Sequence, residues 1–171
     1  MVELDALLKL SSGMCIISAK NGSEMNGCIV NTVLQVAPTP PLIAVSINRE
    51  NLTYDFILAS RRFAVSILSE EAPIEFISSF GFRSGRNVNK FEDTHYVFGQ
   101  TATPIITDYT VAFVEADVIN SIDAGPHTIF IAEVVNCETL NNQQLPMTYD
   151  YYRDVINGKT PRTAPTYYLE E

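Results

Sequence analysis

The stretch NGCIVNTVLQVAPTPPLIAVSIN, residues 26–48, decides the fold. Two apolar runs in it, Cys28–Val30 and Leu42–Ile47, carry the β-branched bias of buried strands. The polar pair Asn31–Thr32 interrupts the first run, and three prolines within residues 38–41 break the chain before the second. A strand that served only a core would carry Val or Leu at positions 31 and 32. The polar pair therefore predicts a contact with something other than the core.

The segments around this stretch are mostly strands. Met14–Lys20 is an apolar strand, and the Asn-Gly that follows it is typical of a tight hairpin turn. The chain then returns along the opening stretch. Further strands are predicted at Arg62–Leu68, Val111–Ile122 and His127–Leu140, the last two joined by the turn sequence Asp-Ala-Gly-Pro.

Two short helices are predicted between the strands. The segment YDFILAS has helical apolar spacing and follows Asn51-Leu52-Thr53, so Asn51 or Thr53 is expected as its N-cap. A second helix is expected in EEAPIEFISSF, with Ser69 as its cap and Pro73 in its first turn. Strands punctuated by short helices predict a mainly β barrel or sandwich.

Length and composition fit a single domain over residues 1–171, whose tail at 151–171 is rich in Tyr and Pro and predicts an extended arm. A hydrophobic content of 46% supports a sizeable core. Eleven Lys and Arg against twenty Asp and Glu give a net charge of −9, which disfavours nucleic acid and anionic membranes as partners.

The apolar runs and the cysteines indicate the cellular compartment of the protein. No run approaches the roughly 20 residues that span a bilayer, and the acidic N-terminus is unlike a signal peptide. Cys15, Cys28 and Cys137 are odd in number, far apart and set in apolar runs, so we expect buried or half-buried thiols in a reducing cytoplasm.

The placement of the few cations is informative. Residues 76–91 hold no acidic residue but contain Arg83, Arg86 and Lys90 among serines and glycines. Such a segment suits a phosphate or another oxyanion, and an ordinary solvated loop is the alternative. Arg49 adds a cation just before a helix whose first-turn amides could hold a phosphate, although simple capping explains that position equally well.

Conventional catalytic motifs are absent, since the sequence contains no GxSxG, HExxH, P-loop or GxGxxG. Of the two histidines, His95 fits a surface loop, and His127 at a barrel rim fits a capping residue or a substrate contact. Cys28 fits a small buried hydrophobe better than a nucleophile. We therefore predict no catalytic side chain and no metal ligand. A site so poor in ionisable groups suits a cofactor that carries its own reactivity, such as a flavin.

Residues 26–53 resemble the flavin-binding segment of the flavin reductase-like family, whose fold is the FMN-binding split barrel. The segments SGRNVNKF at 84–91, GPHTIFIAEV at 125–134 and YYRDVINGKTPRTAPTY at 151–167 agree, so the resemblance covers roughly residues 5–167. It is closest to the flavin reductase module of high-molecular-weight rubredoxins and flavoredoxins. The resemblance implies a homodimeric, mainly β split barrel with a few short helices.

The same resemblance implies an FMN-dependent oxidoreductase that takes hydride from NADH or NADPH and passes electrons to free flavin or a small redox protein. A rubredoxin partner would be a separate protein, because the sequence has no CxxC pair. An FMN-binding electron carrier without NAD(P)H reductase activity is the alternative, and a split-barrel module for haem or a protein partner is a third possibility. Pro126 and Ala132 stand where the family commonly has Asp and Gly, and both departures fall on the nicotinamide side.

The resemblance also implies roles for individual residues. His127 would contact the nicotinamide substrate, and the tail from Tyr151 would pack on the partner subunit of the homodimer. The implied cofactor-binding residues are Cys28, Ile29, Val30, Asn31 and Thr32 along the flavin ring; Ser46, Ile47, Asn48, Arg49, Asn51 and Thr53 around the ribityl chain and phosphate; and Ser84, Gly85, Arg86 and Lys90 closing over the flavin or the pyridine nucleotide.

Overall fold

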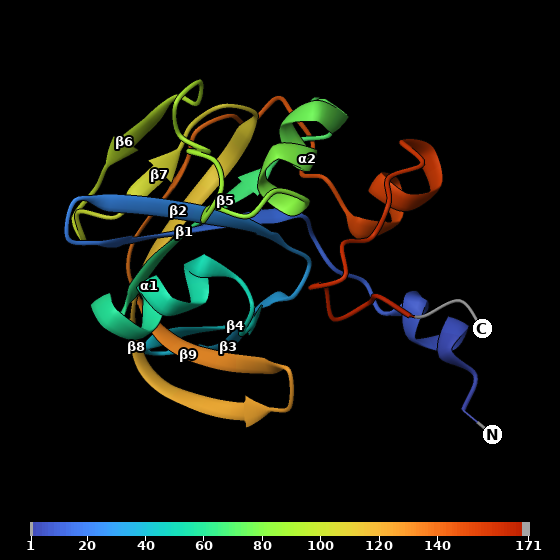
Figure 1. Cartoon of the computed structure of the whole chain (residues 1–171), viewed down its shortest axis with the longest axis horizontal. Coiled ribbons are helices and arrows are strands. Elements are labelled where there is room, and N and C mark those ends of the chain that lie inside the picture. The colour runs from blue at the N-terminus through green and yellow to red at the C-terminus, as the bar shows by residue number, and fades with distance from the viewer. Residues whose placement is uncertain (1, 169–171) are drawn as a thin grey trace.

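One antiparallel sheet of seven strands, in the order β2-β1-β5-β8-β9-β4-β3, forms most of the computed structural model, which describes residues 2–168 (Figure 1). The predicted mainly β fold is confirmed. The strands of this sheet are β1 (Cys15–Asn21), β2 (Glu24–Val30), β3 (Val33–Pro38), β4 (Pro41–Asn48), β5 (Arg62–Leu68), β8 (Thr110–Ala124) and β9 (His127–Thr139).

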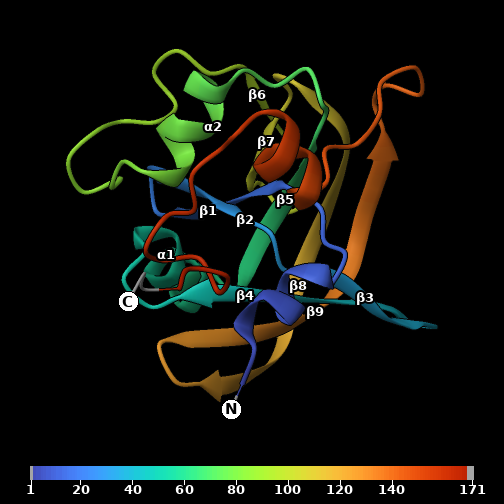
Figure 2. The same cartoon turned by 90° about the vertical axis from the view of Figure 1, so that its right-hand side faces the viewer.

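The remaining elements are short. They are the 3-10 helix η1 (Leu4–Lys9), the helices α1 (Leu52–Ser60) and α2 (Ile74–Gly81), the hairpin of β6 (Tyr96–Phe98) and β7 (Pro104–Ile106), and the π-helical turn η2 (Tyr151–Val155). Figure 1 shows η2 and the C-terminal segment at the end of the molecule beyond α2, and in Figure 2 this end faces the viewer.

The connection between β2 and β3 forces the sheet to close. These are its two outermost strands, yet only Asn31 and Thr32 separate them. Three Cα–Cα steps span at most about 11 Å, whereas the edges of a flat seven-stranded sheet would lie roughly 29 Å apart. Within residues 2–168 no ladder joins β2 to β3, and the Thr32 carbonyl in the connection accepts from the Ser46 amide of β4 at 3.2 Å, which continues the β3–β4 pairing. The barrel is therefore split at this corner.

The long hairpin of β8 and β9 holds the two halves of the sheet together. β8 pairs with β5, β9 pairs with β4, and the two strands pair with each other. Their turn is tight because Gly125 adopts φ of 69°, and the Asp123 carboxylate accepts a hydrogen bond from the Gly125 amide at 2.9 Å. Both strands fall within two residues of their predicted bounds.

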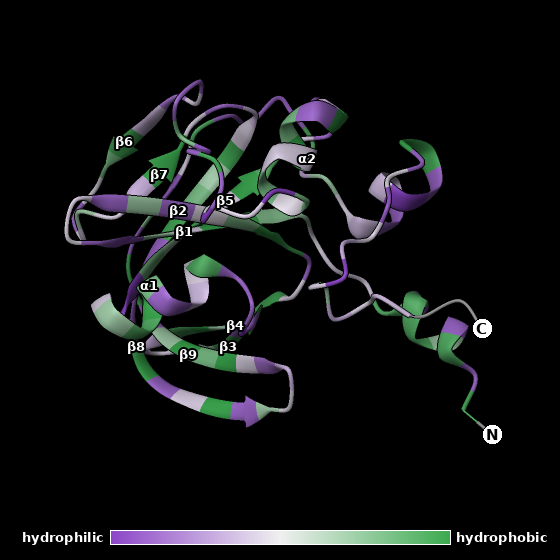
Figure 3. Cartoon of the chain, in the orientation of Figure 1, coloured by the Kyte–Doolittle hydropathy of each residue, from purple (hydrophilic) through white to green (hydrophobic). Residues whose placement is uncertain are grey.

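Apolar residues fill both faces of β1. Ile17 points into the barrel with Val45, Phe63 and Phe130, whereas Ile16 faces a second cluster that includes the α2 residues Ile77 and Phe80. Figure 3 shows the hydrophobic colouring that runs along these strands. A strand covered on both sides carries a continuous apolar run, which explains why β1 lacks an alternating pattern.

The second predicted helix begins later than expected. α2 starts at Ile74, with extended backbone at Pro73 (φ −70°, ψ 152°), so the prediction of Ser69 as its cap is wrong. The Ser69 amide instead donates to the Tyr109 carbonyl at 2.7 Å, which holds Ser69 outside the helix. For α1 the prediction of Asn51 at the N-cap is confirmed, although its side chain makes no capping hydrogen bond.

The C-terminal segment differs from the predicted arm at its start. Residues 151–155 form a π-helical turn because Tyr152, only 2% exposed, packs into the cluster beneath α2 of its own chain. Residues 169–171 of the predicted arm lie outside the described residues. Among the cysteines, Cys15 and Cys28 are buried as expected, whereas Cys137 is exposed.

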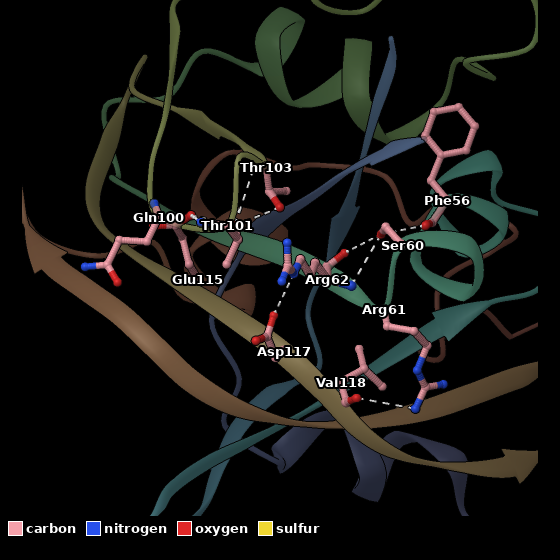
Figure 4. Close-up of polar contacts among 10 residues, drawn as sticks. All are labelled: Phe56, Ser60, Arg61, Arg62, Gln100, Thr101, Thr103, Glu115, Asp117 and Val118. Atoms are coloured by element: carbon pink, nitrogen blue, oxygen red, sulfur yellow. Dashed lines mark hydrogen bonds and ion pairs between the residues drawn. The ribbon is translucent and has the colours of Figure 1, made fainter. Parts of the chain in front are cut away.

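A buried carboxylate stabilises the loop that leads into β7. Glu115 on β8 has no exposed surface and accepts hydrogen bonds from the Gln100 and Thr101 amides at 2.9 Å and from the Thr101 hydroxyl (Figure 4). It also accepts one from Asn136 at 2.7 Å. Burial acts to raise the pKa of Glu115, but these four donors prevail and hold it below its ordinary value. A Cβ at Gly99 would collide with this carboxylate.

We predict that Glu115→Gln destabilises the fold by about 1–3 kcal/mol at neutral pH, because an amide nitrogen cannot accept from buried donors. A carboxyl whose pKa is lowered by folding stabilises the protein above its unfolded-state pKa of about 4.3. That contribution disappears as the pH falls through the folded-state value. The difference from the wild type should therefore shrink between about pH 5 and 3 in urea unfolding followed by circular dichroism.

The matched control for this prediction is Asp117→Asn. Asp117 lies on the same strand and pairs with Arg62, but both side chains are about half exposed, so we expect less than about 1 kcal/mol. Equal stability of Glu115→Gln and the wild type at pH 7 would contradict the role given to Glu115.

Candidate functional site

The corner residue Asn31 is a buried polar side chain with unused hydrogen-bonding capacity. It is 5% exposed, its Nδ2 donates to Thr166 Oγ1 at 2.9 Å, and its Oδ1 accepts from Thr32 Oγ1 at 3.2 Å. A carboxamide has two donor hydrogens and two acceptor lone pairs. These contacts use one of each, so Asn31 can still donate to and accept from a ligand.

A second polar position lies at the N-terminal end of α1. A hollow of about 290 Å³, called here the α1 hollow, is lined there by Asn51, Leu52, Ser84, Gly85 and Lys90, among others. Four of these are residues that the sequence predicted for the cofactor site, and they come from the two separate segments 48–53 and 84–90. The structure therefore brings the predicted phosphate-side segments together.

Two cations, Arg83 and Lys90, line the α1 hollow, and Lys90 is the one held by the fold. Its Nζ donates to the Gly27 carbonyl at 2.8 Å and to the Phe80 carbonyl at 3.0 Å, and it lies 5.9 Å from the centre of the Phe80 ring. Burial lowers the pKa of Lys90. An ammonium group has three donor hydrogens, and two carbonyls use two of them, so one remains for an anion in the hollow.

The floor beneath Lys90 is tightly packed. Asn26 Nδ2 donates to Thr53 Oγ1 at 2.9 Å, and both side chains are buried. A Cβ at Gly85 would collide with the Asn26 carboxamide, so glycine is required for this close approach. Burial also raises the pKa of the neighbouring Cys28 thiol, which fits an interior hydrophobe and not a nucleophile.

Two of the predicted cations, Arg86 and Arg49, form ion pairs outside the α1 hollow. Arg86 pairs with Asp55 on α1 at 2.8 Å, which ties the 82–90 loop to that helix. Arg49 pairs with Asp123 at 2.8 Å and donates to Thr128 at 3.2 Å, so its guanidinium lies on the β8–β9 hairpin. This hydrogen-bonded pairing lowers the pKa of Asp123. Neither guanidinium lines the α1 hollow.

The other residues predicted around the ribityl chain shape the backbone. Ser46 is held by its amide at the corner, and Ile47 is fully buried in the barrel core. The Asn48 side chain accepts from the Glu50 amide at 2.9 Å, which fixes the turn into α1. Thr53 is buried against Asn26.

Three neighbouring hollows connect the α1 end to the corner. A central hollow of about 20 Å³, lined by Ile29, Val30 and Asn31, shares Gly81, Phe82 and Thr163 with the α1 hollow. A corner hollow of about 360 Å³, lined by Asn31 and Thr32, shares Asn31 and Tyr149 with the central one. Together they form one line, called here the groove, from Lys90 to Thr32.

His127, the first residue of β9, contacts Thr163, which lines two of these hollows. Its Nε2 lies 3.0 Å from the carbonyl oxygen of Thr163, and a carbonyl only accepts, so Nε2 carries the hydrogen. The groove residues Phe82, Thr163 and Tyr149 were not predicted from the sequence. Only Thr163 lies in a segment that carries the family resemblance, 151–167, and no local pattern in the sequence indicates that residue 163 lies beside residue 127.

Comparison with known proteins identifies the family. Residues 7–157 match the family described as "Flavin reductase like domain". The chain belongs to this family. This flavin reductase like chain is 44% identical over 166 residues to the high molecular weight rubredoxin of Moorella thermoacetica, covering 97% of this chain and 72% of that protein. It is 39% identical over 167 residues to a ferric-chelate reductase (NAD(P)H) of Archaeoglobus fulgidus, covering 98% of each.

A solved structure supports the fold. The NADH:FAD oxidoreductase of Streptomyces globisporus C-1027 matches with a TM-score of 0.74 and 24% identity, covering 84% of both chains. At this identity the likeness concerns the fold alone. Within residues 2–168 of the flavin reductase like chain, no helix is long and apolar enough to cross a membrane.

We predict that Arg86 acts on the flavin reductase like site through the loop it holds. Arg86→Ala and Asp55→Ala should each change stability by less than about 1 kcal/mol, because both side chains are half exposed. A double-mutant cycle in urea should give a coupling energy of about 0.2–1 kcal/mol. Additive effects of the two substitutions would show that the pair does not hold the loop.

Proposed function

We propose that this chain binds FMN along the groove, takes hydride from NADH or NADPH, and passes electrons to free flavin or a small redox protein. The observation that carries the proposal is the pairing of an anion site at Lys90 with a carboxamide of unused capacity at Asn31, at opposite ends of one groove. The reductase names of the relatives support the activity, and the rubredoxin name supports a redox-protein partner.

The phosphate of FMN fits the α1 end. First-turn amides of a helix lack intrahelical acceptors and favour anions. The Asn51 side chain does not cap these amides, and Lys90 supplies a neighbouring positive charge. In a chain of net charge −9, this combination is a local exception that suits a phosphate monoester.

The ring of the flavin fits the corner end. Its pyrimidine edge needs both donors and acceptors, and Asn31 and Thr32 offer both. Ile29 and Val30 supply the apolar wall beside them. When bound, FMN supplies the redox chemistry, and the protein holds the two rings in register for transfer.

FMN is favoured over FAD by the surroundings of the phosphate site. Arg86 and Asp55 tie the loop across α1, and Glu50 lines the α1 hollow. A second phosphate and an adenosine would meet a closed loop and a carboxylate there. Parallel titrations with FMN and FAD test this preference directly.

We also propose a homodimer in the cytoplasm. Leu34 and Val36 on β3 are 52% and 46% exposed, and Leu10 near the same corner hollow is 70% exposed. An exposed apolar surface beside a binding groove is typical of an interface between subunits. A second copy covering it would also bury the open side of the corner hollow.

We predict that Lys90→Met weakens FMN binding by about 10- to 100-fold, the loss of one charge-assisted hydrogen bond. Riboflavin has no phosphate, so its affinity should change much less. Quenching of flavin fluorescence measures both affinities. Lys20→Met, which removes a cation beside Phe98, is the matched control. An unchanged FMN affinity in Lys90→Met would contradict the proposed position of the phosphate at this end of the groove.

We predict that NADH or NADPH bleaches the visible flavin absorbance of the FMN-loaded protein when nucleotide and protein are mixed anaerobically in a stopped-flow instrument. His127→Ala should slow this bleaching more than it weakens FMN binding, because His127 lies on the proposed nicotinamide side. A flavin that stays oxidised with both nucleotides would favour the alternative, an electron carrier without reductase activity. Pro126, which replaces the common Asp, is the feature that keeps this alternative open.

A further inference from the structure

The chain beyond η2 is anchored at one point. The Gly158 amide donates to the Tyr152 carbonyl at 2.9 Å, and the Tyr152 hydroxyl donates to the Lys159 carbonyl at 2.8 Å. A Cβ at Gly158 would collide with the Tyr152 ring. Because Tyr152 is buried in the core, the chain is fixed up to Lys159.

Residues 160–168, called here the strap, then contribute lining residues to all three hollows of the groove. Thr163 lines the α1 hollow, Pro161 and Ala164 line the central hollow, and Thr166 lines the corner hollow. The central hollow keeps only about 20 Å³ beneath the strap. That volume holds about one water molecule and no flavin ring.

The strap also uses the polar groups that a flavin would use. Thr166 Oγ1 accepts from Asn31 at 2.9 Å and donates to the Tyr149 hydroxyl at 3.1 Å. The Thr163 carbonyl accepts from His127. A ligand that lies along the groove therefore competes with the strap for Asn31 and His127.

Besides its contacts with Asn31, Tyr149 and His127 through Thr163 and Thr166, the strap is held by a hydrogen bond between the Thr160 and Tyr149 hydroxyls at 2.7 Å. None of the side chains at 158–168 is buried. Its internal hydrogen bonds are local turns, from Ala164 to the Pro161 carbonyl at 2.9 Å and from Tyr167 to the Ala164 carbonyl at 3.1 Å. A segment with few buried contacts opens at low free energy, so a bound ligand can displace it.

We propose that the strap is an intramolecular cover of the flavin groove that closes the free chain and swings out about Lys159 when flavin binds. This inference rests on the proposed function of the same groove. The strap lowers the apparent affinity for flavin by the fraction of chains in which it is closed, so 90% closure would weaken binding about tenfold.

The first test is Thr166→Val, which removes the hydroxyl that holds Asn31 and keeps the shape of the side chain. We expect it to bind FMN about three- to tenfold more tightly than the wild type, measured by quenching of flavin fluorescence. Thr139→Val, at the exposed end of β9, is the matched control. Unchanged or weaker binding by Thr166→Val would overturn the proposal.

The second test uses the wild-type chain and limited trypsin cleavage. Arg162 is exposed on the strap, so cleavage after it reports the mobility of this segment. Saturating FMN should accelerate this cleavage several-fold, while cleavage after Arg153 in the anchored turn stays constant. Protection by FMN, or no change, would show that the strap stays in place over the bound flavin.

The two proposals fail in different ways. If neither the wild type nor Thr166→Val quenches FMN fluorescence, the groove does not bind flavin, and both proposals fall. If FMN binds while its affinity in Thr166→Val and the cleavage after Arg162 are unchanged, the flavin site stands and the cover is wrong.

Discussion

A covalent constraint shapes the whole molecule, namely that two residues join the outermost strands of a seven-stranded sheet. Asn31 and Thr32 can connect β2 to β3 only if the sheet curls until its edges meet. The β8–β9 hairpin allows this curl because it pairs with both halves of the sheet. The split that remains between β2 and β3 leaves backbone and side-chain groups at the corner without ladder partners. The site is thus a consequence of the closure of the barrel.

The polar pair in the opening stretch is therefore explained by position. Val or Leu at 31 and 32 would suit a strand interior, but these residues form a corner where the ladder is interrupted. The Asn31 side chain forms hydrogen bonds there with two other side chains, Thr32 and Thr166. The cis peptide bond before Pro40 and the bulge in β3 belong to the same short return from the corner into β4.

Short-range patterns in the sequence predicted the fold well. The strands β1, β5, β8 and β9 and the helix α1 follow from apolar runs, turn dipeptides and caps, which are local. The three-residue strands β6 and β7 were missed because they are too short to show a period. Partners across long separations were also missed. Nothing near Arg49 indicates Asp123, and Thr166 lies 135 residues from the Asn31 that it contacts. The family resemblance predicted which segments form the site. It did not predict the ion pairs of the site's arginines or the contacts that the strap makes with the site.

The buried Glu115 and the half-buried Lys90 differ in how completely the fold satisfies their charges. Glu115 receives four hydrogen bonds, from Gln100, Asn136 and both donors of Thr101, so its charge is fully used within the fold. Lys90 donates to two carbonyls, so within residues 2–168 two of its three donor hydrogens have a protein acceptor. Burying a charge is costly unless its partners are complete. Glu115 is thus completed within the fold, whereas Lys90 keeps donor capacity beside a helix N-terminus, which is why the phosphate is proposed there.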